Sequence, residues 1–258
     1  MKIGGRAYKN GVRLVGPNYS VKAYYQDGEL KYSIGKKVVK NNKFLSLAKK
    51  TPIIRGVFSL FTALISFFKE ATGNPRRYWL ILLLLVIDII IEGYLILMPE
   101  SSNALLKSIP DFNIYFDILI LGAIAFLLRG TLLKETFKFH GAEHKAVNYY
   151  EDNFAKPLMV QSRLANRCGT NLVVFYMILL NIFIFTGINI NEFLANLLAI
   201  GIAYEVISYA PDSILSVAYL VQCFTTIEPD EKHLKASATA LRVLIAKETG
   251  ESPPSIIV

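Results

Sequence analysis

Four long apolar runs constrain the fold of this chain more than any other feature of its sequence. They cover residues 79–98, 115–133, 172–188 and 193–210. A helix needs about 20 mostly apolar residues to cross the hydrocarbon core of a bilayer. The sequence therefore predicts a mainly α-helical chain, a polytopic membrane bundle of about four spans. Residues 213–224 form a further apolar piece, which is too short to count as a fifth span.

The composition indicates a membrane protein that also has a water-facing part. Hydrophobic residues make up 53% of the chain and charged residues 19%, whereas soluble domains are about 45–50% apolar. The charged fraction is too high for a bundle that is embedded in lipid throughout. Because the chain has only two cysteines, a disulfide-stapled scaffold is excluded.

Basic residues are concentrated towards the N-terminus. Residues 1–78 contain 16 of the 28 Lys and Arg but only three of the 20 Asp and Glu. Residues 134–171 are also rich in Lys and Arg, whereas segments 99–114 and 189–192 are not. Since basic segments tend to stay on the cytoplasmic side, four spans with both termini in the cytoplasm satisfy the charge rule at every loop. The expected location is the cell (cytoplasmic) membrane, with the lipid bilayer as the first partner.

These patterns divide the chain into four regions. Residues 1–50 are predicted to be a basic cytoplasmic β-rich unit, because residues 11–40 alternate apolar and polar positions around a hairpin signal at Asp27-Gly28. A three-stranded meander is expected there. Residues 51–78 hold an apolar run of about 12 residues and are predicted to be an interfacial or re-entrant helix. Residues 79–224 form the transmembrane bundle with a cytoplasmic loop at 134–171, and residues 225–258 a C-terminal helix and tail.

The sharpest chemical signal is His140-Gly141-Ala142-Glu143-His144, which fits the H-x-x-E-H arrangement of metal hydrolases. Residues 134–151 have helical composition, so His140 and His144 lie on one face and are able to share a divalent metal ion. Glu143 flanks them as a general base for a water activated by the metal. Glu151 returns to that face and is a candidate acceptor for an imidazole N–H. The alternative is a cytoplasmic helix with two solvated histidines.

The sequence offers two candidates for a third ligand. Cys168 precedes the third span and would complete a His-His-Cys set that suits zinc and leaves one position open. Glu205 lies within the fourth span towards its cytoplasmic end, where a carboxylate is costly unless it has a function. Arg55 and Arg167 are predicted to bind an anionic group, such as a carboxylate or a lipid phosphate. An alternative for the segment around Cys168 is a helix start capped by Thr170.

Taken together, these residues resemble the bacterial YqhQ-like family of multi-pass membrane proteins. The resemblance rests on motifs spread over nearly the whole chain: Gly4-Gly5-Arg6-Ala7, Gly16-Pro17, Pro52 with Arg55-Gly56, His140 to Lys145, Arg167 to Thr170, Tyr204-Glu205, and Thr225, Thr226, Glu228 and Pro229. It implies a metal-dependent protein without an established reaction, with Thr170, Thr225, Thr226 and Glu228 in supporting positions. His233 stands where the family usually has Gln, which argues against His233 as a ligand.

Two functions from different classes are compatible with these features. The first is a metal-dependent membrane hydrolase at the cytoplasmic face, its substrate unknown. The second is a non-enzymatic membrane protein whose metal or polar site is structural and whose basic N-terminal unit docks a partner protein, a ribosome or anionic lipid headgroups. A transporter is a third reading, favoured only by acids within the predicted spans, Asp88, Glu92 and Asp117, which also fit polar contacts between helices. No specific nucleic acid is expected.

Overall fold

The structure is a computed structural model in which residues 1–37, 43–73, 75–97, 123, 126–166, 168–187 and 190–250 are described. The chain divides into two compact units, Met1–Gly56 with Ala125–Val258, and Val57–Ile124. The chain is mainly helical and has an N-terminal antiparallel sheet.

The sheet has four strands in the order β1-β2-β3-β4, namely Gly4–Tyr8, Gly11–Val15, Tyr19–Gln26 and Glu29–Lys36. The three predicted strands are present, and the predicted hairpin turn has positive φ at both Asp27 and Gly28, as a two-residue hairpin loop requires. The fourth strand, β1, was not predicted. Its sequence GGRAY has no alternating apolar pattern, and it is held by pairing with β2.

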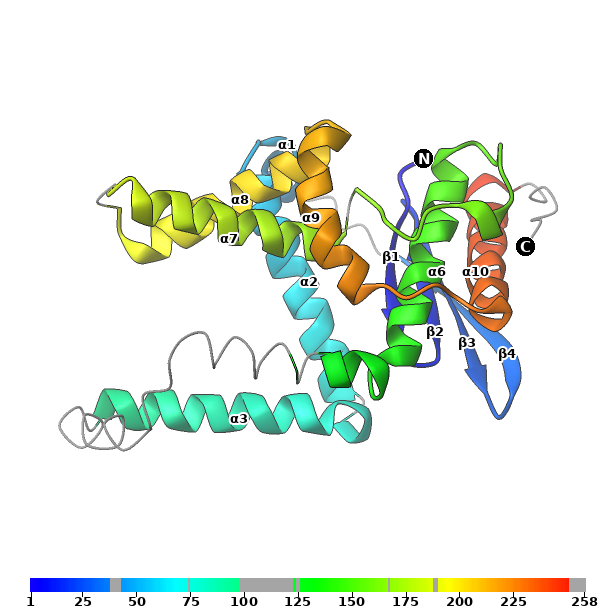
Figure 1. The fold of residues 1–258 in the computed structure, drawn as a ribbon, viewed down its shortest axis with the longest axis horizontal. Coiled ribbons are helices and arrows are strands. Elements are labelled where there is room, and N and C mark those ends of the chain that lie inside the picture. Colours follow the sequence, from blue (N-terminus) through cyan, green and yellow to red (C-terminus); the bar gives the residue numbers. More distant parts are fainter. Residues whose placement is uncertain are drawn as a thin grey trace. The chain divides into compact units, whose positions relative to one another are not determined.

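Two helices cover one face of this sheet, α6 (Lys134–Glu151) and α10 (Glu231–Thr249) (Figure 1). The bounds of α6 match the predicted helix, and α10 agrees with the predicted C-terminal helix. Alternate strand residues point towards the helices, because successive side chains of a strand face opposite sides. The resulting core is closely packed and includes Val12, Leu14, Val21, Ala23, Phe139, Ala142, Leu241 and Leu244. This packing fixes α6, and therefore the histidine motif, against β1 and β2.

Three apolar helices form a second cluster in the same unit: α7 (Gly169–Phe185), α8 (Glu192–Tyr209) and α9 (Asp212–Thr225). Their shared core is small and consists of Phe175, Ala203, Ile207, Leu215 and Ala218. Within the described residues, α8 alone is long and apolar enough to cross a membrane, and only 22% of its apolar window is buried. The helices α7 and α9 are apolar but shorter than 18 residues.

Further described helices are α1 (Lys43–Lys50), α2 (Ile54–Gly73) and α3 (Pro75–Leu97), and a 3-10 helix, η1, covers Leu158–Val160. The α2 helix has 20 residues, so it is longer than the apolar run that predicted it. Residues 79–97 of the first predicted span lie within α3, and residue 98 lies outside the described residues. Most of the second, residues 115–133, lies outside the described residues, as do Asp117 and the side chains of Asp88 and Glu92.

His233 is a structural residue of the α6–α10 interface. It is fully buried, and its ring packs on Phe139 with 4.4 Å between centroids. Its Nδ1 accepts the backbone N–H of Asp230 at 3.2 Å, and its Nε2 lies 3.3 Å from a carboxylate oxygen of Glu135. With both nitrogens used in this way the ring is neutral, so its position agrees with the expectation that His233 is not a ligand.

This environment makes a prediction about acid stability. Burial lowers the pKa of His233 below its ordinary value, against the opposing effect of Glu135. The unfolded chain then takes up a proton more readily than the folded one, so stability falls as the pH drops below about 6.5. His233→Gln retains both hydrogen bonds without titrating. Thermal unfolding at about pH 7.5 and about pH 5.5 should show a smaller acid-induced loss in the variant than in the wild type. Equal losses would contradict this role.

Candidate metal centre

The α6 helix brings the two histidines of the motif together. The rings of His140 and His144 lie one turn apart, with centroids 4.3 Å apart and planes at 61°. Gly141 lies between them and faces the backbone carbonyl of Ile227 so closely that any side chain there would collide with it. Glycine therefore lets the segment after α9 lie directly against α6, beside the histidines.

Backbone carbonyl groups fix the orientation of both imidazole rings. The Nδ1 of His140 lies 3.0 Å from the carbonyl oxygen of Thr225, and the Nδ1 of His144 lies 2.7 Å from that of Arg163. A carbonyl oxygen only accepts hydrogen bonds, so each Nδ1 must carry the proton. The lone pair of each neutral ring is therefore on Nε2. This is the arrangement found in metal-binding histidines, whose other nitrogen donates to a carbonyl or carboxylate.

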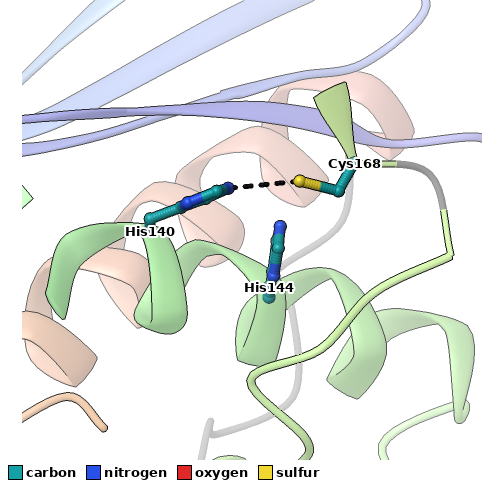
Figure 2. Close-up of side chains that lie close together, drawn as sticks. All are labelled: His140, His144 and Cys168. Carbon is teal, nitrogen blue, oxygen red and sulfur yellow. Dashed lines mark hydrogen bonds between the residues drawn. The ribbon is translucent and has the colours of Figure 1, made fainter. Parts of the chain in front are cut away.

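Cys168 supplies a third donor atom next to these nitrogens. Its Sγ lies 3.4 Å from His140 Nε2 (Figure 2), and it caps the start of α7 by accepting the N–H of Thr170. Burial raises the pKa of the thiol, but the adjacent His144 and the N–H of Thr170 more than offset this, and the pKa lies below its ordinary value. A thiol of this kind is readily converted to the thiolate that binds metals.

The three donor atoms form a candidate site for a single metal ion. They all lie within 4.8 Å of one another, and no other such group of His, Cys, Asp and Glu occurs in the described part of the chain. Typical bond lengths place two ligand atoms of one tetrahedral zinc ion about 3.3–3.6 Å apart, close to the observed separation of His140 and Cys168. Two imidazoles and a thiol suit zinc, and three protein ligands leave one position open. The structure thus contains a possible His-His-Cys site.

Glu143 lies beside this cluster with an unusual environment for a carboxylate. It is 6% exposed, and among the described residues no hydrogen-bond donor contacts it. Its Oε2 lies 3.7 Å from Nε2 of His144. Burial raises the pKa of Glu143 to about 7, against a smaller opposing effect of His140. A carboxylate with a pKa near neutrality is suited to exchanging protons with a bound water.

Two cavities border Glu143. The larger, about 260 Å³, is lined by residues of β1, α6 and the start of α7: Gly5, Arg6, Ala7, Thr136, Phe137, His140, Glu143, His144, Cys168 and Gly169. The smaller, about 120 Å³, is lined by Ile3, Gly4, Gly5, Glu143, His144, Val147, Glu151, Ala165 and Asn166. Gly5 contributes to both, and a side chain there would collide with the Glu143 carboxylate. The open side of the candidate metal site therefore faces a space that a small group is able to enter.

A buried polar network holds the segment that carries Cys168 and the Arg163 carbonyl. The Gln222 amide accepts the N–H of Ala165 at 2.8 Å and donates to its carbonyl at 3.0 Å. Asn171 donates to the same carbonyl at 3.0 Å. Both amide side chains are fully buried. These residues were not singled out from the sequence, because an isolated Gln or Asn in an apolar helix gives no sign of its partner.

Of the supporting residues expected from the family resemblance, Thr225, Thr226 and Glu228 lie at the end of α9 and just after it, and Thr170 lies in the first turn of α7. Thr170 and Thr225 share a hydrogen bond between their hydroxyl groups at 3.1 Å, and Thr226 is fully buried with its hydroxyl on the Gln222 carbonyl. Glu228 pairs with the buried amine of Lys145 at 2.7 Å. The segment just after the Thr225 carbonyl is therefore tied to α6, by the Glu228–Lys145 ion pair and by the hydrogen bond from the N–H of Ile227 to the Phe137 carbonyl.

Glu205 and Arg55 lie away from the cluster and pair with each other. The Arg55 guanidinium makes two hydrogen bonds to the Glu205 carboxylate, one of them of 2.8 Å from Nε, and the backbone N–H of Ile53 donates a third at 3.0 Å. Glu205 is thus neutralised by Arg55 instead of facing the histidines, and Arg55 is occupied by Glu205 instead of an external anion. Both predictions for these residues are corrected by this ion pair.

Of two further predicted residues, one does not contribute to the cluster and the other is not described. Glu151 lines the smaller cavity, but the acceptors for the imidazole N–H groups are carbonyl oxygens, so it does not fill the predicted role. Arg167 lies outside the described residues.

Comparisons with known proteins agree with the resemblance seen in the sequence. Residues 51–247 match a family model described as "Protein of unknown function (DUF1385)". The chain is 29% identical over 213 residues to the "Uncharacterized protein YqhQ" of Bacillus subtilis (strain 168), an alignment that covers 68% of this chain and 66% of that protein. It thus spans slightly less than two thirds of the relative's length. No solved structure matches the chain.

Proposed function

We propose a function for this chain, which belongs to the YqhQ-like family of proteins of unknown function, DUF1385: it is a metal-dependent hydrolase that acts at the cytoplasmic face of a membrane. One observation carries the proposal. Two imidazole Nε2 atoms, fixed by backbone carbonyls, converge with the Cys168 thiol beside a cavity that also contains a buried carboxylate without a hydrogen-bond donor among the described residues.

The residues of the site divide the chemistry between them. His140, His144 and Cys168 would hold the metal, which supplies Lewis acidity at the open position when bound. Glu143 accepts the proton of an attacking water and delivers it to the leaving group as the scissile bond breaks. The Thr225 and Arg163 carbonyls keep both imidazoles in the required tautomer throughout. Proton transfer by such a positioned group typically contributes about 10²–10⁴-fold to the rate.

A structural metal site, with the basic N-terminal unit docking a partner protein, a ribosome or anionic lipid headgroups, is the second candidate. Structural zinc sites are usually closed by four protein ligands. Glu205, the other residue predicted as a ligand besides Cys168, is bound to Arg55 instead, and the open side of the cluster faces the larger cavity. Both features favour the hydrolase. The acids that favoured a transporter have no described side chains.

The membrane location rests on the apolar surface of the helices. The side chains of Phe185, Leu220 and Ile184 are 88%, 78% and 76% exposed, which is unfavourable in water over so large a surface. The α8 helix is long enough to cross a bilayer. With the charge asymmetry of the sequence, these features support about four spans with both termini in the cytoplasm.

This topology is tested with reporter fusions. Fusions after Lys107 and after Glu192 should report a location outside the cytoplasm, and a fusion after Lys156 should report a location inside it, because the basic segment 134–171 is retained on the cytoplasmic side. An outside signal at Lys156 would move the candidate site to the other face and contradict the proposed topology.

Removal of the metal tests the hydrolase itself. Protein purified in detergent should hydrolyse at least one of two probes, casein or a dispersed phospholipid ester. Activity should disappear after dialysis against a chelator and return on addition of zinc, because Lewis acidity at the site depends on the ion. Activity that persists in metal-free protein would contradict the proposal. Zinc bound without hydrolysis of either probe favours the structural role.

A further inference from the structure

We infer that the substrate of this site is an extended polypeptide segment that pairs with the free edge of β1. The inference rests on the proposed hydrolase function and adds the class of substrate to it. Three features of the described residues support it: the unpaired edge of β1, the position of Glu143 opposite that strand, and the cavities on both sides of Glu143.

The alternation of hydrogen bonds along the strands shows which backbone N–H and C=O groups of β1 do not bond to β2. The N–H of Tyr25 donates to the carbonyl of Asn10 at 2.7 Å, so even-numbered residues of β2 bond to β3 and odd-numbered ones to β1. In the β1–β2 register, Arg6 pairs with Arg13 and Gly4 with Val15. Because bonding alternates along an antiparallel strand, the N–H and C=O groups of Gly5 and Ala7 point away from β2. Among the described strands, none pairs with that edge.

This free edge forms one wall of a groove that contains Glu143. The larger cavity extends along Gly5, Arg6 and Ala7, and the smaller along Ile3, Gly4 and Gly5. The opposite wall is the segment after η1, which contributes Ala165 and Asn166 to one cavity and Cys168 and Gly169 to the other. Glu143 borders both cavities. The groove thus continues on both sides of the proposed base, as a substrate cleaved in its interior requires.

The backbone of β1 is exposed where it passes Glu143. Gly4 and Gly5 are both exposed, and the space beside Gly4 is open. The five residues of β1 span about 16 Å, which matches a short extended peptide. An added strand would satisfy the outward-facing N–H and C=O groups by main-chain hydrogen bonds. A lipid chain has no groups that form hydrogen bonds with these N–H and C=O groups, so the free edge of β1 favours a polypeptide as the substrate.

The reaction then follows from the geometry of the pairing. A peptide aligned on β1 presents a backbone carbonyl near Glu143, which lies opposite Gly5. Water adds its oxygen to the carbonyl carbon and gives one proton to Glu143. The C–N bond breaks, and the departing nitrogen takes that proton. The products are a carboxylic acid and an amine, which become a carboxylate and an ammonium group when the second proton of the water passes from the new carboxyl group to the amine, and no oxidant or further co-reactant is needed.

A pair of proline variants tests the edge. Ala7→Pro removes one outward-facing N–H of β1 without removing a bond to β2, which edge strands tolerate. Tyr32→Pro is the matched control, because the N–H of Tyr32 points outward at the opposite edge of the same sheet. With casein as the probe, binding to metal-free protein and cleavage by zinc-loaded protein should both weaken at least tenfold in Ala7→Pro. Tyr32→Pro should match the wild type in both measurements.

Hydrogen exchange keeps the test independent of how well Ala7→Pro folds. In metal-free wild-type protein, casein should slow the exchange of the amide protons of Gly5 and Ala7, while phospholipid should not. Casein cleavage with unchanged exchange at both positions would overturn the inference and leave the hydrolase intact. Hydrolysis of the phospholipid without hydrolysis of casein would also overturn the inference and leave the proposed hydrolase function intact. If zinc-loaded wild-type protein hydrolysed neither probe, the proposed function would be contradicted. Protection of the Gly5 and Ala7 amide protons by casein would still support peptide binding at β1.

Discussion

Glu143→Gln is expected to lower the rate of hydrolysis by about 10²–10⁴-fold, the usual contribution of a positioned general base. The amide has the shape of the carboxyl group but does not accept a proton from water. Glu143 is not one of the three convergent donor atoms, so the variant should bind as much zinc as the wild type. The measurement is the steady-state rate with casein or the phospholipid ester, together with the zinc content of the same sample.

The two measurements separate a base from a ligand. Loss of zinc in Glu143→Gln would make the carboxylate a ligand instead of a base. Full activity in a zinc-loaded variant would contradict the proposed mechanism and favour the structural role. A suitable control is Glu231→Gln, since Glu231 is exposed on α10, lies outside the cluster and lines neither cavity. It should retain the zinc content and most of the activity.

The sequence predicted the residues of the site that local helix geometry brings together. A spacing of four residues on a helix places two side chains on one face, and the rings of His140 and His144 do lie together. Cys168 joins them from another helix, and the sequence offered it as one of two alternatives. The groups that orient the imidazoles are backbone carbonyls. Every residue has such a group, so no sequence pattern distinguishes the two that matter.

Glu205 and Arg55 show why the other part was missed. Each was assigned a role by itself, one as a ligand and one as an anion-binding residue, because a charge near a membrane span suggests a function. The structure pairs them across 150 positions of sequence. Ile53, two residues before Arg55, has a φ of 67°, which is rare for a β-branched residue, and its N–H joins the pair. Neither the pairing nor this backbone conformation is visible from composition or spacing.

The fold also divides into elements that a local sequence pattern predicted and elements that it did not. The strands β2 to β4 were predicted because their apolar positions alternate with the period of a strand, and α6 was predicted from its helical composition. β1 was not, because Gly4 and Gly5 carry no side chains for a pattern. The absence of side chains that hid this strand also lets its backbone pass close to Glu143. The least predictable element of the sheet therefore contributes directly to the candidate site.

A double variant, His140→Asn with His144→Asn, is expected to lose zinc almost completely. Each Asn amide retains an N–H donor near the position of Nδ1, so the bonds to the Thr225 and Arg163 carbonyls are preserved, while the two Nε2 atoms are removed. Loss of an outer partner of a ligand already weakens metal binding about 10–100-fold, so losing two ligands should cost more than about 100-fold. Zinc content after dialysis against a weak chelator measures the effect.

His233→Gln is the matched control for this experiment. It removes the third histidine of the chain, which is buried against α6 but lies outside the cluster, so it should retain the zinc content of the wild type. Normal thermal unfolding of the double variant would show that the preserved hydrogen bonds maintain the fold. If the folded double variant still bound zinc as the wild type does, the metal would have to lie elsewhere, and the assignment of His140, His144 and Cys168 would be wrong.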